Sequence, residues 1–202
     1  MQPSFRLEQA GGIHLLQLVS SDATNRLTRE SVLGLTEAVE KLRTHPLPLL
    51  IAGNSRFFSV GADLNEIASL TGPAALEFAR MGQSLMDAIA SFPAPVAAAI
   101  EGHCMGGGFD LALACHYRIA GPQSVFGHRG AALGLITGWG GTQRLPRLIG
   151  KSPALQLFTA AEKIDARQAL ALGLVHAIAE RPLEAAVQMV TSACGPAIDS
   201  DH

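Results

Sequence analysis

The chain reads Phe58-Ser59-Val60-Gly61-Ala62-Asp63 at one glycine-rich turn and His103-Cys104-Met105-Gly106-Gly107-Gly108 at a second. Each turn follows an apolar run typical of a strand and precedes a segment with the character of a helix. Free backbone N–H groups and the positive end of the dipole at a helix N-terminus favour an anion there. Two such turns could hold one carbonyl oxygen, and each preorganised donor contributes roughly 2.7–4 kcal/mol to an oxyanion-like transition state. The pattern indicates an enzyme that stabilises an enolate or oxyanion.

The composition fits one compact domain with a sizeable core, because 48% of the 202 residues are hydrophobic and 16% are charged. A formal net charge of −2 provides no basic surplus, which argues against nucleic acid or an anionic membrane surface as the main partner. The three cysteines have no ligand-like spacing and are odd in number, so neither a metal site nor a disulfide framework is indicated.

The N-terminus has Arg6 and Glu8 where a signal peptide would have its apolar core, and no apolar run approaches the roughly eighteen residues of a membrane span. We therefore expect a soluble, untargeted protein of the cytoplasm, a reducing compartment that suits free cysteines.

Short apolar runs alternate with segments of helical periodicity, which predicts an α/β architecture with right-handed crossovers and ligand sites at the carboxyl ends of the strands. Ala10-Gly11-Gly12 predicts the turn of an opening hairpin, and Thr28 is the expected N-cap of the first helix. The expected strands are residues 5–8, 14–19, 49–52, 95–100, 117–120 and 125–126. The expected helices are residues 29–43, a long segment between Thr71 and Pro93, and residues 109–115, 142–149, 152–160 and 165–172.

No low-complexity segment or charge run marks a linker, so residues 1–180 are expected to form one core. Residues 181–202 are expected to add a short C-terminal helix, which Cys194-Gly195-Pro196 ends, and a disordered tail.

Three segments, in this order and spacing, resemble the enoyl-CoA hydratase/isomerase, or crotonase, superfamily. They are Phe58-Ser59-Val60-Gly61-Ala62-Asp63-Leu64, Gly106-Gly107-Gly108-Phe109-Asp110-Leu111-Ala112 and Gly140-Gly141-Thr142-Gln143-Arg144-Leu145. The likeness covers roughly residues 5–180. It implies a fold of stacked β-β-α units in a spiral, an acyl-CoA thioester as substrate, and assembly as a homo-oligomer, usually a trimer or a hexamer. It implies no separate cofactor, because coenzyme A is part of the substrate, and no metal.

The resemblance assigns the oxyanion hole to the backbone N–H groups of Ala62 and Gly107. It also makes Ala62, Asp63, Leu64, Asn65 and Gly107 the expected substrate-binding residues. The alternative is that the glycines only permit tight turns and close helix packing.

The chain departs from the family at both acid–base positions. Hydratases of the family use two glutamates, but Asp110 stands at the first position and Gly130 at the second. Asp110 is either the remaining proton-transfer group or an acidic residue that the helix dipole favours. His128 is the expected substitute for the missing carboxylate, since imidazole transfers protons near neutral pH; the alternative is a structural histidine.

Two further departures concern the acyl pocket. Trp139 replaces a residue that is small in the family, and it either narrows the pocket or only packs. Family chains generally continue with several C-terminal helices, so this shortened helical region predicts either an oligomer that covers apolar surface or a more open site.

Loss of one carboxylate favours double-bond isomerisation or decarboxylation over addition of water, because these reactions need fewer positioned proton-transfer groups. The sequence leaves two alternatives to this reaction class: a hydratase with relocated acid–base residues, and a non-catalytic acyl-CoA-binding scaffold. The acyl group is not specified by the sequence.

Overall fold

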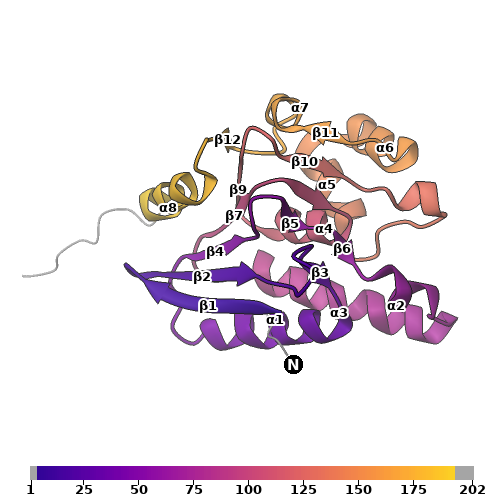
Figure 1. The fold of residues 1–202 in the computed structure, drawn as a ribbon, viewed down its shortest axis with the longest axis horizontal. Coiled ribbons are helices and arrows are strands. Elements are labelled where there is room, and N and C mark those ends of the chain that lie inside the picture. The colour runs from indigo at the N-terminus through magenta and orange to yellow at the C-terminus, as the bar shows by residue number, and fades with distance from the viewer. Residues whose placement is uncertain (1–3, 194–202) are drawn as a thin grey trace, which may run out of the picture.

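The computed structural model describes residues 4–193, which form a large sheet, a smaller second sheet and helices around them (Figure 1). The six-stranded sheet has the order β1 (Phe5–Ala10), β2 (Ile13–Leu18), β4 (Leu49–Ala52), β7 (Val96–Ile100), β9 (Tyr117–Ala120) and β12 (Ala177–Ile178). The four-stranded sheet has the order β11 (Ile164–Asp165), β10 (Val125–Gly127), β8 (His103–Met105) and β5 (Phe57–Ser59). β3 (Arg26–Leu27) and β6 (Gly61–Ala62) form a separate two-stranded sheet.

The helices follow the strands in a regular order. They are α1 (Arg29–Leu42), α2 (Leu64–Ala68), α3 (Gly72–Ala90), α4 (Gly107–Ala114), α5 (Gly141–Ile149), α6 (Lys151–Ala160), α7 (Ala166–Ala171) and α8 (Pro182–Ala193), with a 3₁₀ turn at Gly130–Leu133. Each unit consists of a strand in the large sheet, a short strand in the second sheet and then a helix: β4, β5 and α2–α3; β7, β8 and α4; β9, β10 and α5. The first strands pair in parallel with one another, and so do the second strands. The expected spiral of stacked β-β-α units is confirmed.

The predicted strands and helices are present, and each begins or ends within a few residues of its predicted bounds. The opening hairpin pairs β1 with β2 across Gly11 and Gly12, which both have positive φ angles. The hydroxyl of Thr28 accepts the N–H of Ser31, as expected of the N-cap of α1. The sequence did not indicate β5, β6 and β8, which lie inside the glycine-rich turns, because strands of two or three residues show no periodicity.

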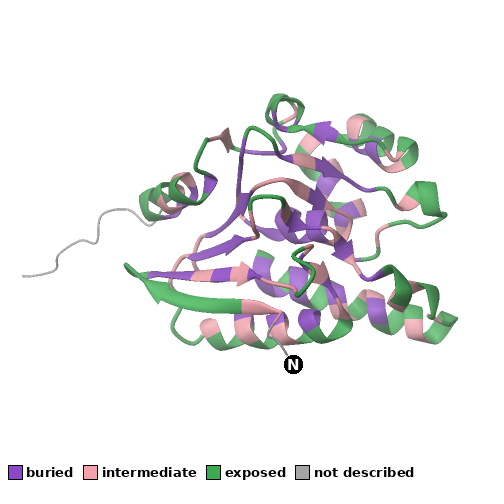
Figure 2. Ribbon diagram, in the orientation of Figure 1, coloured by how far each residue is buried: buried purple, intermediate pink, exposed green. Residues whose placement is uncertain are grey.

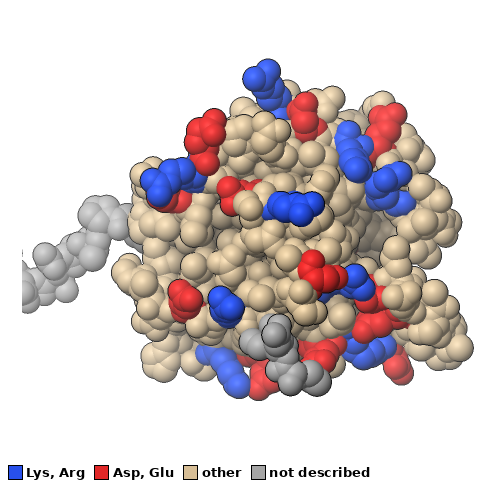
Figure 3. All heavy atoms as spheres, in the orientation of Figure 1, with Lys and Arg blue, Asp and Glu red and all other residues tan. Residues whose placement is uncertain are grey.

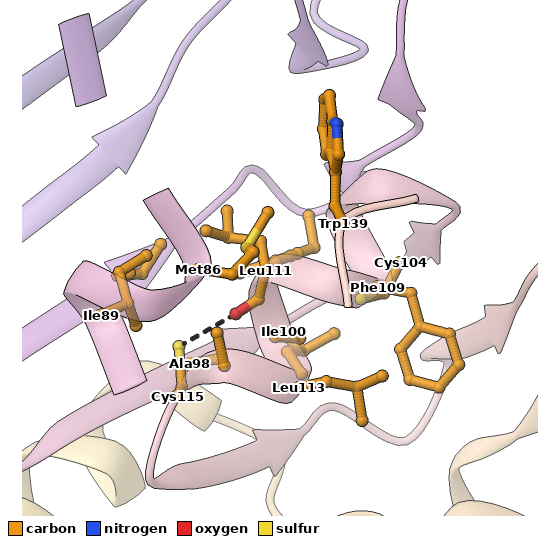
Figure 4. Close-up of a cluster of buried hydrophobic side chains, with 14 of the residues drawn as sticks. Met86, Ile89, Ala98, Ile100, Cys104, Phe109, Leu111, Leu113, Cys115 and Trp139 are labelled. Atoms are coloured by element: carbon orange, nitrogen blue, oxygen red, sulfur yellow. Dashed lines mark hydrogen bonds between the residues drawn. The ribbon is translucent and has the colours of Figure 1, made fainter. Parts of the chain in front are cut away.

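The main core lies between the large sheet and the layer formed by α1, α3 and α4. The strand residues of this core are apolar and buried, and Figure 2 shows them as the purple interior beside the exposed strand β1. Figure 4 shows part of this core, in which Met86 and Ile89 of α3 pack against Ala98 of β7 and Leu111 of α4. Cys104 and Cys115 are buried here as free thiols. Burial raises the pKa of the Cys115 thiol to about 12 and that of Cys104 well above its usual value.

The expected C-terminal helix is α8, which covers the second face of the large sheet. Its Ala186 and Val190 pack with Ala97, Ala99 and Ile119 of β7 and β9. The expected disordered tail and Cys194 lie outside the described residues. Within residues 4–193, no helix is long and apolar enough to cross a membrane, and no group of three metal-ligating side chains is present.

Candidate active site

A pocket of about 530 Å³ lies where the two glycine-rich turns meet, with α2 and α3 on one side and residues 128–139 on the other. Its lining is largely apolar and includes Ala62, Phe78, Gly107 and Trp139. The charged side chains on the face shown in Figure 3 are scattered, with no large patch of either sign. The pocket is therefore suited to an apolar group that is held at a few polar points.

The two glycine-rich turns touch each other through backbone atoms. Gly61 has a φ of +91°, and a Cβ there would lie 2.7 Å from both the nitrogen of Gly107 and the carbonyl oxygen of Met105. Gly106, the residue before α4, has a φ of +52°. Glycine is required at both positions, since a side chain at Gly61 would separate the turns and Gly106 has a backbone conformation that other residues rarely adopt.

This contact brings two backbone donors together. Gly107 is the first residue of α4, so its N–H has no acceptor within the helix. In the β3–β6 pair, the N–H of Asp63 donates to the carbonyl of Leu27. Because successive strand residues alternate in direction, the N–H of Ala62 points away from β3. A Cβ built on Gly107 would lie 3.3 Å from the nitrogen of Ala62, so the two donors are neighbours beside the pocket.

Asp63 fixes the start of α2 directly after Ala62. Its Oδ1 accepts the N–H of Asn65 at 2.7 Å, and its Oδ2 accepts Nη1 of Arg26 at 2.9 Å. The hydrogen bond from Arg26 holds the pKa of Asp63 below its usual value. Leu64 lines the pocket, whereas Asp63 and Asn65 do not. Their predicted contact with substrate therefore stays a prediction, and the observed role of Asp63 is to anchor the turn.

Asp110 presents a buried carboxylate to the pocket from the first turn of α4, where its residue is only 1% exposed. Oδ2 accepts the hydroxyl of Thr137. Oδ1 lies 3.2 Å from Nε2 of His128, but the two groups are not aligned as a hydrogen bond, and neither atom has a hydrogen-bond partner among the described residues. A Cβ on Gly141 would lie 2.1 Å from Oδ1, so the start of α5 packs directly on the carboxylate. Oδ1 is therefore a buried acceptor that no hydrogen bond from the described residues engages.

His128 follows β10 directly and is buried rather than on the surface. Its ring packs against the rings of Phe109 and Phe158, with centroid distances of 5.0 and 5.2 Å. It also lines the pocket, so the structure places the two predicted acid–base residues, Asp110 and His128, side by side. By contrast, His116 accepts the N–H of Val96 and is structural in character.

Gly130 begins the 3₁₀ turn and lines the pocket without a side chain. Among the described residues that line the pocket, Asp110 is the only acidic one. Sequence reasoning missed Thr137, which supports Asp110 from a position 27 residues along the chain. Nothing in the sequence around Thr137 indicates this contact, because the loop after the 3₁₀ turn has no regular pattern.

The fold and site define a class of protein: a spiral of β-β-α units that presents two neighbouring backbone donors and one buried carboxylate to an apolar pocket. The sequence model for the enoyl-CoA hydratase/isomerase family matches residues 8–194, and the chain belongs to this family.

Known proteins with similar sequence or structure carry related descriptions. A probable enoyl-CoA hydratase of Bacillus subtilis is 48% identical over 128 residues, which are 63% of this chain and 50% of that protein. The chain thus spans about half the length of this curated relative. The structure of Pseudomonas aeruginosa DspI is similar with a TM-score of 0.91 and 33% identity, covering 97% of this chain and 82% of DspI. The structure of an enoyl-CoA hydratase from Bacillus anthracis is similar with a TM-score of 0.89 and 29% identity, covering 95% of this chain and 76% of that chain.

Proposed function

We propose that this protein is an acyl-CoA enzyme that forms a thioester enolate and catalyses double-bond isomerisation or decarboxylation rather than hydration. The N–H groups of Ala62 and Gly107 polarise the thioester carbonyl, and Asp110 moves the proton. The observation that carries the proposal is that the pocket contains one carboxylate among residues 4–193, together with two backbone donors that no hydrogen bond of their own helix or strand pair occupies.

Isomerisation needs one group that takes and returns a proton. The carboxylate of Asp110 removes a proton from the α carbon of a β,γ-unsaturated thioester, and the electron pair moves onto the carbonyl oxygen, which the two donors stabilise. The same carboxylic acid then returns the proton to the γ carbon as the double bond forms in conjugation with the thioester. The atoms balance without a second acid or base.

Decarboxylation makes a similar demand. Carbon dioxide leaves the α carbon of a carboxylated thioester, and the electrons of the broken C–C bond move onto the same carbonyl oxygen. Asp110, after taking a proton from solvent, then donates it to the α carbon. Hydration differs, because a water molecule must be oriented and deprotonated while a proton is delivered to the α carbon. Gly130 supplies no group for this, so a hydratase would need His128 to act beside Asp110.

We also propose that coenzyme A enters only as part of the substrate, that no further cofactor is used and that the protein is a cytoplasmic homotrimer or hexamer. Large apolar side chains near the pocket favour association: Leu64, Leu133 and Ile136 are 55%, 58% and 74% exposed. Light scattering at several protein concentrations tests the assembly, and a monomer at all of them contradicts it.

The test of the reaction uses the purified chain and a panel of acyl-CoA thioesters. Mass analysis of the products separates hydration, loss of carbon dioxide and isomerisation, the last with a change in absorbance but none in mass. Asp110→Asn keeps the acceptor for Thr137 and removes proton transfer, so turnover should fall by roughly 10²–10⁴-fold. Asp87→Asn is the matched control, because its carboxylate is exposed on α3 and pairs with Arg144.

Three outcomes contradict the proposal. Robust hydration by the wild type would mean that other residues have taken over the acid–base roles of the two family glutamates. Tight thioester binding without any turnover would mean that the protein is a non-catalytic acyl-CoA-binding scaffold. An unchanged rate in folded Asp110→Asn shows that this residue serves only the helix terminus.

A further inference from the structure

The indole of Trp139 fills a slot between α3 and α4, at the inner wall of the pocket. It is 3% exposed. A Cβ on Gly82 of α3 would lie 2.2 Å from Nε1 and Cδ1 of the indole, and a Cβ on Gly107 of α4 would lie 2.5 Å from Cζ3. The five-membered ring therefore rests on Gly82 and the six-membered ring on Gly107, so the slot exists because neither residue has a side chain.

The indole is held in this slot rather than free to swing out of it. Nε1–H donates to the carbonyl of Phe78 at 3.2 Å, and the two rings pack with centroids 5.3 Å apart. Moving the ring would break this hydrogen bond and leave the indole N–H without its partner, which is costly inside the protein. Gly82 lies inside the 19-residue helix α3, where glycine is less favourable than alanine, and the closeness of the indole explains its presence.

The slot adjoins the position where the thioester carbonyl would bind. Gly107 provides both the surface under the indole and one of the two backbone donors. Phe78, Gly107 and Trp139 all line the same pocket. An acyl chain attached to a carbonyl bound at these donors would thus start beside the indole, which fills the adjoining space between α3 and α4.

We propose that Trp139 determines acyl specificity by closing the slot between Gly82 and Gly107, so that the pocket accepts short acyl groups and excludes longer ones. This inference rests on the proposed acyl-CoA function. The indole acts as a fixed wall: replacing it with a smaller side chain opens a space that is continuous with the pocket and lined by apolar groups.

The test compares the wild type with Trp139→Leu on straight-chain thioesters of four, six and eight acyl carbons. Each added methylene that the enlarged pocket buries should favour the longer chain by about fourfold. The six-carbon to four-carbon ratio of kcat/KM, and of affinity measured by calorimetry, should therefore rise by roughly fifteenfold. Phe92→Leu is the matched control, because it shortens a buried aromatic residue that does not line the pocket, and its ratio should stay at the wild-type value.

The outcomes separate this inference from the proposed function. A wild type that binds none of the thioesters overturns both. A wild type that binds them, together with a folded Trp139→Leu variant whose chain-length ratio is unchanged, overturns only the specificity role. If the leucine variant does not fold, Trp139→Phe retains an aromatic ring in the slot and should raise the same ratio by a smaller factor; an unchanged ratio in that variant also refutes the inference.

Discussion

Replacement of Gly130 by glutamate places a second carboxylate in the pocket, at the position where hydratases of the family have their second glutamate. If hydration is limited by the missing second proton-transfer group, the variant should hydrate crotonyl-CoA faster than the wild type, provided that the local backbone accepts a side chain.

The cost comes from the carbonyl of Leu135. A Cβ on Gly130 would lie 2.8 Å from this oxygen, and the N–H of Leu135 donates to the carbonyl of Gly130 at 2.8 Å. Because the obstacle is backbone, the 3₁₀ turn itself must shift, at an expected cost of about 1–3 kcal/mol in stability. A second positioned acid–base group contributes about 10²–10⁴ in rate. A displacement on the order of 1 Å can remove about 10² of that, so we expect a net gain of roughly tenfold.

The assay follows loss of the conjugated enoyl thioester absorbance, with thermal unfolding measured in parallel. Gly130→Ala is the matched control, since it introduces the same contact with Leu135 but no carboxylate. The ratio of the glutamate to the alanine variant therefore isolates the acid–base contribution. We expect both variants to unfold at lower temperature than the wild type and only the glutamate variant to gain hydration.

Two results would refute this reasoning. One is a folded glutamate variant that hydrates no faster than the alanine variant. The other is robust hydration by the wild type that is unchanged in His128→Ala, since neither the missing carboxylate nor its expected substitute would then matter.

Three further predictions concern other parts of the structure. Ala62→Pro removes one proposed donor but no β3–β6 hydrogen bond, so turnover should fall by roughly 10²–10³-fold with little change in thermal stability; a folded variant with full activity contradicts the oxyanion role. Asp63→Asn keeps the helix cap but loses the ion pair with Arg26. Because pairing lowers the folded-state pKa of Asp63, its stabilisation is present above the ordinary carboxyl pKa of about 3.9 and lost as the pH falls through the lowered value. The difference in Tm between wild type and variant should therefore shrink on acidification, and a constant difference argues against the ion pair. Cys104 and Cys115 should resist an aromatic disulfide reagent at pH 8 until urea unfolds the chain, because burial raises both thiol pKa values; reaction at the unfolded rate in buffer contradicts their burial.

The sequence was sufficient for the elements that have a clear period or cap. The helix after Thr28, the hairpin at Gly11 and Gly12 and the fully apolar strands β4 and β7 were predicted because each pattern has one local structural solution. The strands β5 and β8 were not, since they are three residues long and are stabilised by pairing with each other rather than by their own pattern.

In the site too, some features were predicted from the sequence and others were not. The two glycine-rich turns and the departures at Asp110 and Gly130 were found in the sequence. The contact of Asp110 with His128 and Thr137 was not, because it depends on how α4, the end of β10 and the following loop pack together. The slot for Trp139 likewise needs Gly82, a residue of another helix whose sequence context is that of an ordinary helix interior.

The proposed polarising groups at Ala62 and Gly107 belong to the main chain, whereas the proposed proton-transfer groups at Asp110 and His128 belong to side chains. A point mutation can delete or replace a side-chain acid in one step, but most substitutions leave an N–H group in place. The two halves of the chemistry therefore differ in how readily they change over evolutionary time. A fold of this kind can keep its backbone donors for a thioester carbonyl while its side-chain acids and bases change, and with them the reaction. The presence of Asp110 at one acid–base position and Gly130 at the other is the combination expected of such a change.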